Sequence, residues 1–404
     1  MRRLFWLNFF SLLLVIVALA EWVCATWLLR EIGGIALPAS WHVLGPALIY
    51  LFNRVVVTRS LPPPGPWRTF RRAYTGVAFT SLFGLMFLSV TGVLWLAVSA
   101  AVSLVALISG SAISLTPVVG AVRLFATTGL VGICATMGYG YLFGQRRLWV
   151  NRVGAPVKGL PSALDGFRIA QISDVHLGGF TSPARIARYV ERVNRLDPDL
   201  VVITGDITDG LDHAPETFPV LGGLRARKGV IAILGNHDVY TGADEVTDAL
   251  REHTAFRVLL DDIDVVREGE AGLYVIGLRD RGLDWARGVR ECPVLAGLHE
   301  QVPQGAPVLL LTHRPDLFDH AVELDIPVVL AGHTHGGQVA VPLRRGRAAS
   351  LARFMTRFPR GTYRSADSLL HVNLGLGVTG QPVRLATPRE ITLITLEAAA
   401  NPAG

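Results

Sequence analysis

The first 157 residues contain no lysine and almost no acid. They carry twelve arginines but only two acidic residues, Glu21 and Glu31, whereas residues 158–404 carry 26 basic residues and 30 acidic ones. The net charge is therefore +10 in the front segment and −4 in the remainder. Because the basic excess lies in the front segment, it does not indicate a nucleic-acid partner. An apolar segment that lacks acids and is edged by arginine is typical of a membrane-embedded chain.

Cysteine is also scarce. Cys24 and Cys134 lie in apolar runs, and Cys292 stands alone in the second half. Three isolated cysteines give no disulfide framework. We interpret them as small apolar side chains rather than as nucleophiles.

Apolar runs in residues 1–145 predict a transmembrane region of four to five helices. Residues 4–29 are longer than the ~20 residues needed to cross a bilayer. The other runs are residues 38–57, 73–116 and 118–143. The run 73–116 has 44 positions, which as one helix would measure about 66 Å, roughly twice the hydrocarbon thickness. We therefore favour two helices there, meeting near residues 92–101.

The positions of the arginines indicate on which side of the membrane the chain after the spans lies. Residues 54–72 contain five arginines and no acid, which predicts a cytoplasmic loop. Five spans from a cytoplasmic N-terminus favour an extracytoplasmic position for the rest of the chain, at a bacterial inner membrane. Arg146, Arg147 and Arg152 argue for the cytoplasmic side, and four spans with one long tilted helix would satisfy them.

Glu21 is an ionisable residue inside the first apolar run. Such a residue can form a proton or ion site. We favour the simpler interpretation, an acid that faces inward and pairs with Arg123 or with the membrane interface.

The pattern changes after a segment that we interpret as a linker, residues 146–164. Residues 165–398 alternate short β-rich runs with amphipathic stretches, as in residues 183–196, where Ile186, Val190 and Val193 share one face. This alternation predicts an α/β domain. Residues 399–404 are expected to be a disordered tail.

Polar motifs follow the apolar runs of this domain. The motifs are Asp174-Val-His176, Gly205-Asp206-Ile-Thr-Asp209, Gly235-Asn236-His237-Asp238, His313 and Gly332-His333-Thr-His335. Ligands at the carboxyl ends of strands are how open α/β sheets build sites. Carboxylate oxygen with imidazole nitrogen suits Zn, Mn or Fe, and the number of ligands suits two adjacent cations. Asp206, central in the set, is the natural bridging carboxylate, and the glycines allow the backbone to approach closely.

The five motifs resemble those of the calcineurin-like metallophosphoesterase superfamily, over roughly residues 160–396. The resemblance extends to its bacterial membrane-anchored branch through residues 159–167, 332–338 and 375–380. It implies a four-layer αββα sandwich behind the membrane region. It also implies a hydrolase that cleaves phosphoric ester or anhydride bonds with a hydroxide bridging two divalent metal ions.

The resemblance also implies a role for each motif residue. Asp174, His176 and His335 would hold the first metal, and Asn236, His313 and His333 the second, with Asp206 bridging. His237 would protonate the leaving oxygen or stabilise the transition state, oriented by Asp238. For Asp209 we favour orienting a ligand or capping a turn over direct ligation.

An arginine-rich segment gives the best indication of the substrate. Residues 342–365 contain seven arginines and no acid. Leu351, Phe354, Met355 and Phe358 are spaced as one apolar helix face, with Arg353 and Arg357 off it. Such a helix would lie on an anionic bilayer, which suggests a lipid or lipid-linked substrate contacted by Arg353, Arg357, Phe354 and Phe358. The alternative is a lid that packs its stripe on the domain's own core.

Other functions stay open at this point. The −4 charge of the catalytic half disfavours a nuclease, but a phosphoprotein phosphatase fits the same motifs. A non-catalytic membrane sensor or scaffold is a different class, which a degraded ligand set would favour. We expect a membrane-anchored phosphodiesterase or pyrophosphatase, with the lipid bilayer and a phosphorylated substrate as partners.

Overall fold

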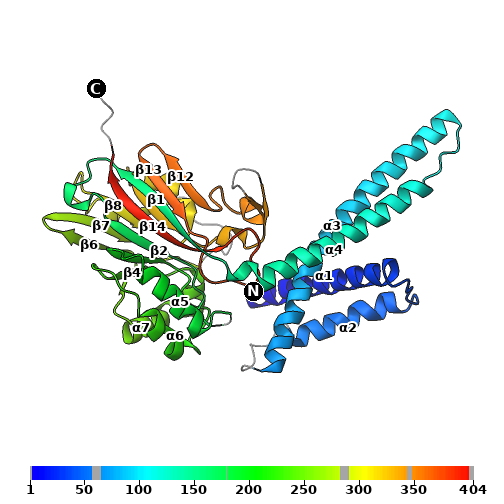
Figure 1. The fold of residues 1–404 in the computed structure, drawn as a ribbon, viewed down its shortest axis with the longest axis horizontal. Helices are drawn as coiled ribbons and strands as arrows, with labels where there is room; N and C mark the ends of the chain where they lie inside the picture. The colour runs from blue at the N-terminus through cyan, green and yellow to red at the C-terminus, as the bar shows by residue number, and fades with distance from the viewer. Residues whose placement is uncertain (1, 57–64, 179, 283–290, 344–347, 400–404) are drawn as a thin grey trace. The chain divides into compact units, whose positions relative to one another are not determined.

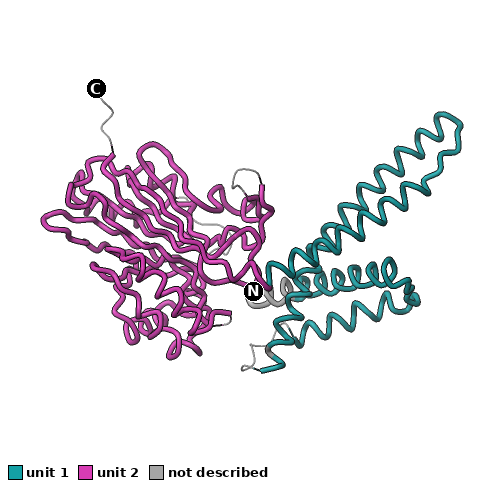
Figure 2. Tube along the Cα trace, in the orientation of Figure 1, with its two compact units in different colours: residues 1–141 teal, residues 142–404 magenta. Residues whose placement is uncertain are grey.

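The computed structural model covers residues 1–404 and describes all of them except 1, 57–64, 179, 283–290, 344–347 and 400–404. The chain divides into two compact units, residues 1–141 and 142–404 (Figure 2). Each unit has its own internal packing and is described by itself.

The first unit is helical. Its helices are α1 (Arg2–Glu31), α2 (Trp41–Val56), α3 (Pro66–Ser109) and α4 (Thr116–Leu142). Within the part of the unit that the structure describes, three stretches are long and apolar enough to cross a membrane: Ser11–Glu31, Thr69–Ser109 and Thr116–Arg146. Helix α2 has 16 residues and is shorter than the ~20 residues of a standard span.

The hairpin expected near residues 92–101 is absent, because α3 is one continuous helix of 44 residues. Apart from Pro66 at its first position, α3 contains no proline, and no charge interrupts it after Arg72. Gly110, in the left-handed conformation at φ 64°, caps its C-terminus. Of the four to five helices expected, the described residues contain four, with one long helix in place of the favoured pair.

Glu21 does not pair with Arg123. Its carboxylate accepts a hydrogen bond of 2.6 Å from Asn53 of α2, whose own carbonyl accepts one of 2.7 Å from Tyr74 of α3. Arg123 instead makes a bidentate pair with Glu31. The buried Glu21 thus takes part in a hydrogen-bond chain that joins three helices. The expected pairing with Arg123 was wrong, because the partner of Glu21 is Asn53.

The second unit contains two six-stranded sheets (Figure 1). The first sheet has the order β1 (Leu148–Val157), β14 (Arg389–Ala398), β2 (Arg168–Ile172), β3 (Leu200–Thr204), β4 (Val230–Ile233) and β5 (Arg257–Val258). The second has the order β12 (Gly361–Ser365), β13 (Ser368–Val372), β9 (Val328–Ala331), β8 (Val308–Leu311), β7 (Ala271–Gly277) and β6 (Asp262–Glu268). Strands β2 to β5 run parallel, as do β13, β9, β8 and β7.

Three apolar cores give the unit four layers. One core lies between the sheets, where Leu200 and Ile231 pack with Leu309 and Leu330. A second core joins the first sheet to α5 (Pro183–Asn194), α6 (Ala214–Leu221) and α7 (Asn236–His253). The third joins the second sheet to α8 (Pro293–His299) and α9 (Phe318–Glu323). The expected αββα sandwich is confirmed.

The segment 146–164 is more than a linker. Strand β1 lies inside it and pairs in parallel with β14 at ten positions, from Leu148 opposite Arg389 to Val157 opposite Ala398. A strand that contributes a full row of backbone hydrogen bonds to the first sheet belongs to the domain. The expected boundary near residue 165 was therefore too late.

The arginine-rich segment is not an amphipathic α-helix. Among its described residues, only a 3₁₀ turn, Leu351–Phe354, is helical, and the chain then continues irregularly towards β12. Pro359 restricts the residue before it to extended conformations, so a helix through Phe358 is disfavoured. The expected apolar face is split, because Phe358 is buried against Phe318 whereas Phe354 is 86% exposed. Arg344, Arg345 and Arg347 lie outside the described residues.

Candidate metal centre

The predicted ligands all follow the carboxyl ends of parallel strands. Asp174 and His176 follow β2, Asp206 follows β3, and Asn236 opens α7 after β4. In the second sheet His313 follows β8, while His333 and His335 follow β9. Parallel strands end at the same edge of a sheet, so these residues converge although 161 sequence positions separate Asp174 from His335.

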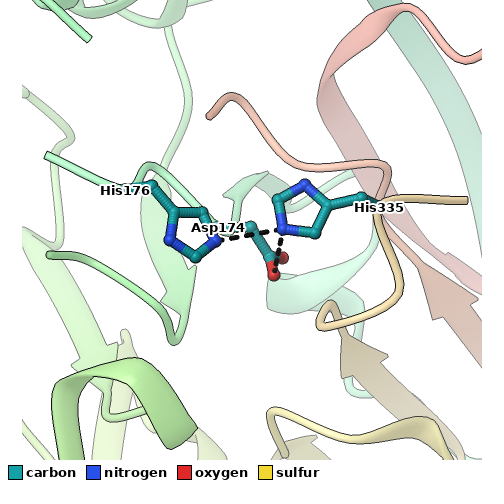
Figure 3. Close-up of side chains that lie close together, drawn as sticks. All are labelled: Asp174, His176 and His335. Carbon is teal, nitrogen blue, oxygen red and sulfur yellow. Dashed lines mark hydrogen bonds and ion pairs between the residues drawn. The ribbon is translucent and has the colours of Figure 1, made fainter. Parts of the chain in front are cut away.

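One group contains Asp174, His176 and His335 (Figure 3). The Nε2 atoms of the two imidazoles lie 3.0 Å apart, and His335 Nε2 lies 3.4 Å from Asp174 Oδ1. All three side chains are buried. Three donor atoms that face one another in a buried space fit the ligand shell of a cation.

A second group contains Asp206, His313 and His333. His313 Nε2 lies 3.3 Å from Asp206 Oδ2, 3.2 Å from His333 Nδ1 and 3.1 Å from the amide oxygen of Asn236. Four side chains thus converge, with the oxygen and nitrogen donors that borderline divalent metals accept.

Asp206 lies between the two groups. The same oxygen, Oδ2, is 3.3 Å from His313 Nε2 and 3.7 Å from His176 Nε2. Its other oxygen accepts a hydrogen bond of 2.8 Å from the His237 amide. One carboxylate oxygen of Asp206 therefore faces both groups.

Hydrogen bonds behind two of the imidazoles set their tautomers. His313 Nδ1 lies 2.8 Å from the Thr204 carbonyl oxygen, and His176 Nδ1 lies 2.7 Å from Asp209 Oδ1. An acceptor at Nδ1 holds the proton there and leaves the Nε2 lone pair for a metal. The two Nδ1 contacts therefore suit these imidazoles to bind a cation through Nε2. Amino-acid composition alone does not indicate such contacts.

Asp209 also contacts His237. The same Oδ1 atom accepts from His176 Nδ1 at 2.7 Å and from His237 Nδ1 at 2.8 Å. Asp238, expected to orient His237, does not do so. Its carboxylate instead accepts hydrogen bonds from the backbone amides of Ile207, Thr208 and Gly235. Asp238 thus holds the loop after β3 against the loop after β4. The residue that orients the His237 imidazole is Asp209.

The electrostatics follow from burial and from charge pairing. Burial alone would lower the pKa of His176 and His313, but the facing carboxylates outweigh it. Asp209 and Asp206 raise the pKa of His176 to about 9, and Asp206 raises the pKa of His313 to about 10. Burial would raise the pKa of Asp209, yet the imidazoles of His176 and His237 lower it to about 2. His176 and His313 thus hold a proton strongly, and a cation that bound at their Nε2 atoms would displace it.

Burial shifts the other side chains in the opposite direction. It lowers the pKa of His335 well below its usual range, helped by the neighbouring His176, and that of His333, helped by His313. Burial, and then the nearby Asp206, raises the pKa of Asp238 to about 7.

Backbone strain concentrates at the same residues. Five candidate ligands have positive φ: Asp174 (49°), His176 (47°), Asp206 (51°), His333 (71°) and His335 (49°). A non-glycine residue in the left-handed region costs on the order of 1–3 kcal/mol. Such strain persists where packing over-determines it, which is typical of sites that serve function rather than stability.

Two glycines allow the backbone to lie against the ligands, as expected. A Cβ on Gly332 would lie 1.9 Å from Ser173 Oγ and 2.3 Å from Asp174 Oδ2. A Cβ on Gly205, whose φ is 87°, would lie 2.5 Å from His313 Nδ1. Any larger residue at either position would displace a ligand.

An open pocket of about 350 Å³ adjoins His237. It is lined by Asp209, Gly210, Leu211, Asp212, His237, Tyr240 and Thr241. The Tyr240 ring lies 5.9 Å from the His237 ring and is 54% exposed. Tyr240 and Asp212 were not predicted, because nothing in sequence distinguishes them from other residues of a loop and a helix start.

A buried arginine was also missed. Arg384 donates to the backbone carbonyls of Gly375, Gly377 and Thr387 and lies 3.2 Å from His335 Nδ1. Burial, and then the nearby Arg389, lowers its pKa to about 9. It holds the loop after β13 against a candidate ligand. One arginine in a long loop carries no periodic signal that could have indicated this.

The predicted substrate contacts are placed apart from these groups. Arg357 pairs with Asp319 at 2.7 Å, and Arg353 and Phe354 are exposed. Phe358 belongs to the core beneath the second sheet. No contact between these side chains and the candidate ligands is found within the described ranges.

Comparisons with known proteins agree with this geometry. Residues 167–337 match the family model described as calcineurin-like phosphoesterase. A zebrafish transmembrane protein with a metallophosphoesterase domain is 32% identical over 278 residues, which cover 65% of this chain and 60% of that protein. An uncharacterised metallophosphoesterase of Bacillus subtilis, YkuE, is 28% identical over 68% of this chain and 95% of its own length.

A third relative, an uncharacterised metallophosphoesterase of Campylobacter jejuni, is 31% identical over 59% of this chain and 61% of its own length. The chain thus spans about three fifths of the zebrafish and Campylobacter proteins. Residues 167–337 of the sandwich, which contain all seven candidate ligands, thus resemble the calcineurin-like phosphoesterases.

Proposed function

We propose that this chain is a membrane-anchored phosphoesterase that uses two divalent cations, of Mn, Zn or Fe, to hydrolyse a phosphodiester or pyrophosphate of a lipid or lipid-linked compound. The observation that carries the proposal is the position of Asp206 Oδ2, which faces both His176 and His313 at 3.7 and 3.3 Å. A single-metal or purely structural site does not need a carboxylate shared between two ligand groups.

The donor set fits two cations. Asp174, His176 and His335 would hold one, Asn236, His313 and His333 the other, and Asp206 both. When bound, two such cations neutralise phosphate oxygens and lower the pKa of a coordinated water towards neutrality.

The chain's own contribution to bond breaking lies in His237. Asp209 accepts from its Nδ1, so the ring is held with Nε2 as the remaining site for a transferable proton. His237 lines the pocket, where it can donate this proton to the leaving oxygen.

The lipid part of the proposal rests on an exposed apolar surface. Four residues form the hairpin surface, on and beside strands β10 (Ala340–Pro342) and β11 (Ala348–Ser350): Val341, Leu343, Leu351 and Phe354, which are 64, 48, 58 and 86% exposed. Arginines lie between these residues and after them in the sequence. Exposed apolar side chains among cations suit an anionic bilayer surface even without an amphipathic helix.

The helices and the arginines beside them support a proposal for the side of the membrane on which the catalytic domain lies. The fifth span that favoured an extracytoplasmic domain is absent among the described residues. If α2, despite its 16 residues, crosses together with α1, α3 and α4, then one side of the membrane holds Arg2 and Arg3, the basic stretch 54–72 and the arginines after α4. Since arginine prefers the cytoplasmic flank, we propose the cytoplasmic side of a bacterial inner membrane. Reporter fusions at the C-terminus test this, and an active periplasmic reporter would contradict it.

Activity is tested on the purified full-length chain in detergent. The chain, loaded in turn with Mn, Zn and Fe, should hydrolyse an activated bis-aryl phosphodiester. Asp206→Asn and Asn236→Ala should each lower turnover at least about 100-fold, because each removes a proposed ligand. Folded protein with no turnover under any metal, or variants as active as the parent, would refute the proposal.

A further inference from the structure

The pocket beside His237 determines which alcohol can leave. This inference rests on the proposed function, in which His237 protonates the leaving oxygen. The phosphoryl oxygens would lie at the two ligand groups, and the open pocket that His237 lines is the adjoining space that could receive the departing alcohol. Its walls therefore select the leaving group rather than the phosphate that remains.

The charge of this pocket is negative. Its lining includes two carboxylates, Asp209 and Asp212, and no lysine or arginine. Asp209 is engaged by two imidazoles. Asp212 is exposed and has no ion-pair partner among the residues that the structure describes. A leaving group with its own phosphate or carboxylate would be repelled here, and a cation would be attracted.

An aromatic face lies in the same pocket. The Tyr240 ring is tilted 51° to that of His237, and its side chain interacts with those of Arg314 and Asn236. Arg314 is in turn paired with Asp280 at 2.5 Å. The tyrosine is thus anchored at its hydroxyl end while its exposed ring remains in the pocket wall. Aromatic faces beside carboxylates are the usual recognition elements for ammonium groups.

We propose that the pocket binds an ammonium-bearing alcohol, so that the preferred substrate is a phosphodiester of a small amino alcohol. The P–O bond to the amino alcohol breaks, and an oxygen of water forms the new P–O bond. His237 gives its proton to the leaving oxygen, and the proton released from water replaces it. The products are the free amino alcohol and a phosphomonoester on the retained group. A volume of about 350 Å³ is sufficient for such a head group.

The test compares two matched substrates on the full-length, metal-loaded chain in detergent. Both are short-chain diacylglycerol phosphodiesters with the same retained group. One leaving group is 2-aminoethanol and the other is propan-1-ol, which has the same size and no charge. Release of each alcohol is followed by ³¹P NMR of the phosphomonoester, with an activated bis-aryl diester as the reference for basal hydrolysis.

The aminoethyl diester should have a kcat/KM about tenfold above that of the propyl diester. Asp212→Asn should lower kcat/KM for the aminoethyl diester about two- to fivefold, the usual effect of an exposed ion pair, and leave the propyl diester unchanged. Tyr240→Leu should lower the aminoethyl value by a similar factor. Asp244→Asn, an exposed residue of α7 outside the pocket, is the charge-matched control and should change neither value.

Equal kcat/KM values for the two diesters in the parent protein would overturn this inference. It would also be overturned if Asp212→Asn and Asp244→Asn behaved alike, or if the bis-aryl diester were cleaved and neither alkyl diester were. Failure to cleave the bis-aryl diester as well would instead refute the phosphoesterase proposal. Thermal unfolding of Asp212→Asn separates loss of binding from loss of fold, because Asp212 also precedes the start of α6.

Discussion

Asp209 offers the sharpest perturbation of the site, because a single oxygen supports two functions. Its Oδ1 lies 2.7 Å from Nδ1 of His176, a proposed metal ligand, and 2.8 Å from Nδ1 of His237, the proposed proton donor. Asp209→Asn keeps an acceptor oxygen but removes the charge. Asp209→Ala removes both hydrogen bonds. The two variants should therefore lower metal affinity and turnover by different amounts.

The size of each effect follows from the bonds that are lost. A hydrogen bond to a charged group contributes about 1.5–3 kcal/mol, which corresponds to roughly 10- to 150-fold. Losing the bond to His176 should weaken the cation site of Asp174, His176 and His335 by about 10- to 100-fold. Losing the bond to His237 should lower kcat further at saturating metal, within the range of about 100- to 10,000-fold for a proton donor.

Two measurements separate these effects. Calorimetric titration of the metal-free full-length chain gives the affinity of each cation, and turnover at saturating metal gives the catalytic loss. In a His237→Ala background, Asp209→Ala should still weaken metal binding but should hardly change turnover. Asp244→Asn is the matched control. If Asp209→Ala kept both the metal affinities and the turnover of the parent protein, the assignment of a double role to this carboxylate would be refuted.

Three further predictions concern the surroundings of the site. Gly332→Ala should displace Asp174 and abolish binding of one cation, because its Cβ would lie 2.3 Å from Asp174 Oδ2; a metal analysis that still returned two cations would contradict this. Arg384→Met should lower the free energy of unfolding by about 3 kcal/mol in a denaturant titration, since it leaves buried carbonyls without donors, and Arg384→Lys should recover only part of it. Phe354→Ser should raise KM for long-chain diesters in anionic vesicles severalfold and leave soluble diesters unaffected, and an equal effect on both would argue against a membrane contact.

Much of the sandwich and the ligand set could be predicted from sequence, because both depend on local patterns. Buried strands such as 200–204 are continuous apolar runs, and each motif follows one of them. Parallel strands bring such motifs to one edge whatever the sequence between them. The joint order of the motifs therefore predicts the convergence of Asp174, Asp206, His313 and His335. That these residues hold two metals remains a prediction.

The incorrect predictions concern features that depend on distant contacts. The neighbour of His237 is set by how the β3 and β4 loops pack, so Asp209 rather than the adjacent Asp238 reaches it. The spacing of Leu351 and Phe358 predicted a helix, but burial of Phe358 against Phe318 and the following proline determine another path. The prediction of two helices in place of α3 was wrong because hydrocarbon thickness limits only the part of a helix that lies in the membrane. It does not require the helix to end there.

The central claim is that seven side chains hold two cations at one edge of the sandwich. Elemental analysis of the purified full-length chain, reconstituted with excess metal and then freed of unbound ions, tests it directly. The account predicts two equivalents per chain in the parent protein and a loss of at least one in Asp206→Asn. One equivalent or fewer in the parent protein would contradict it.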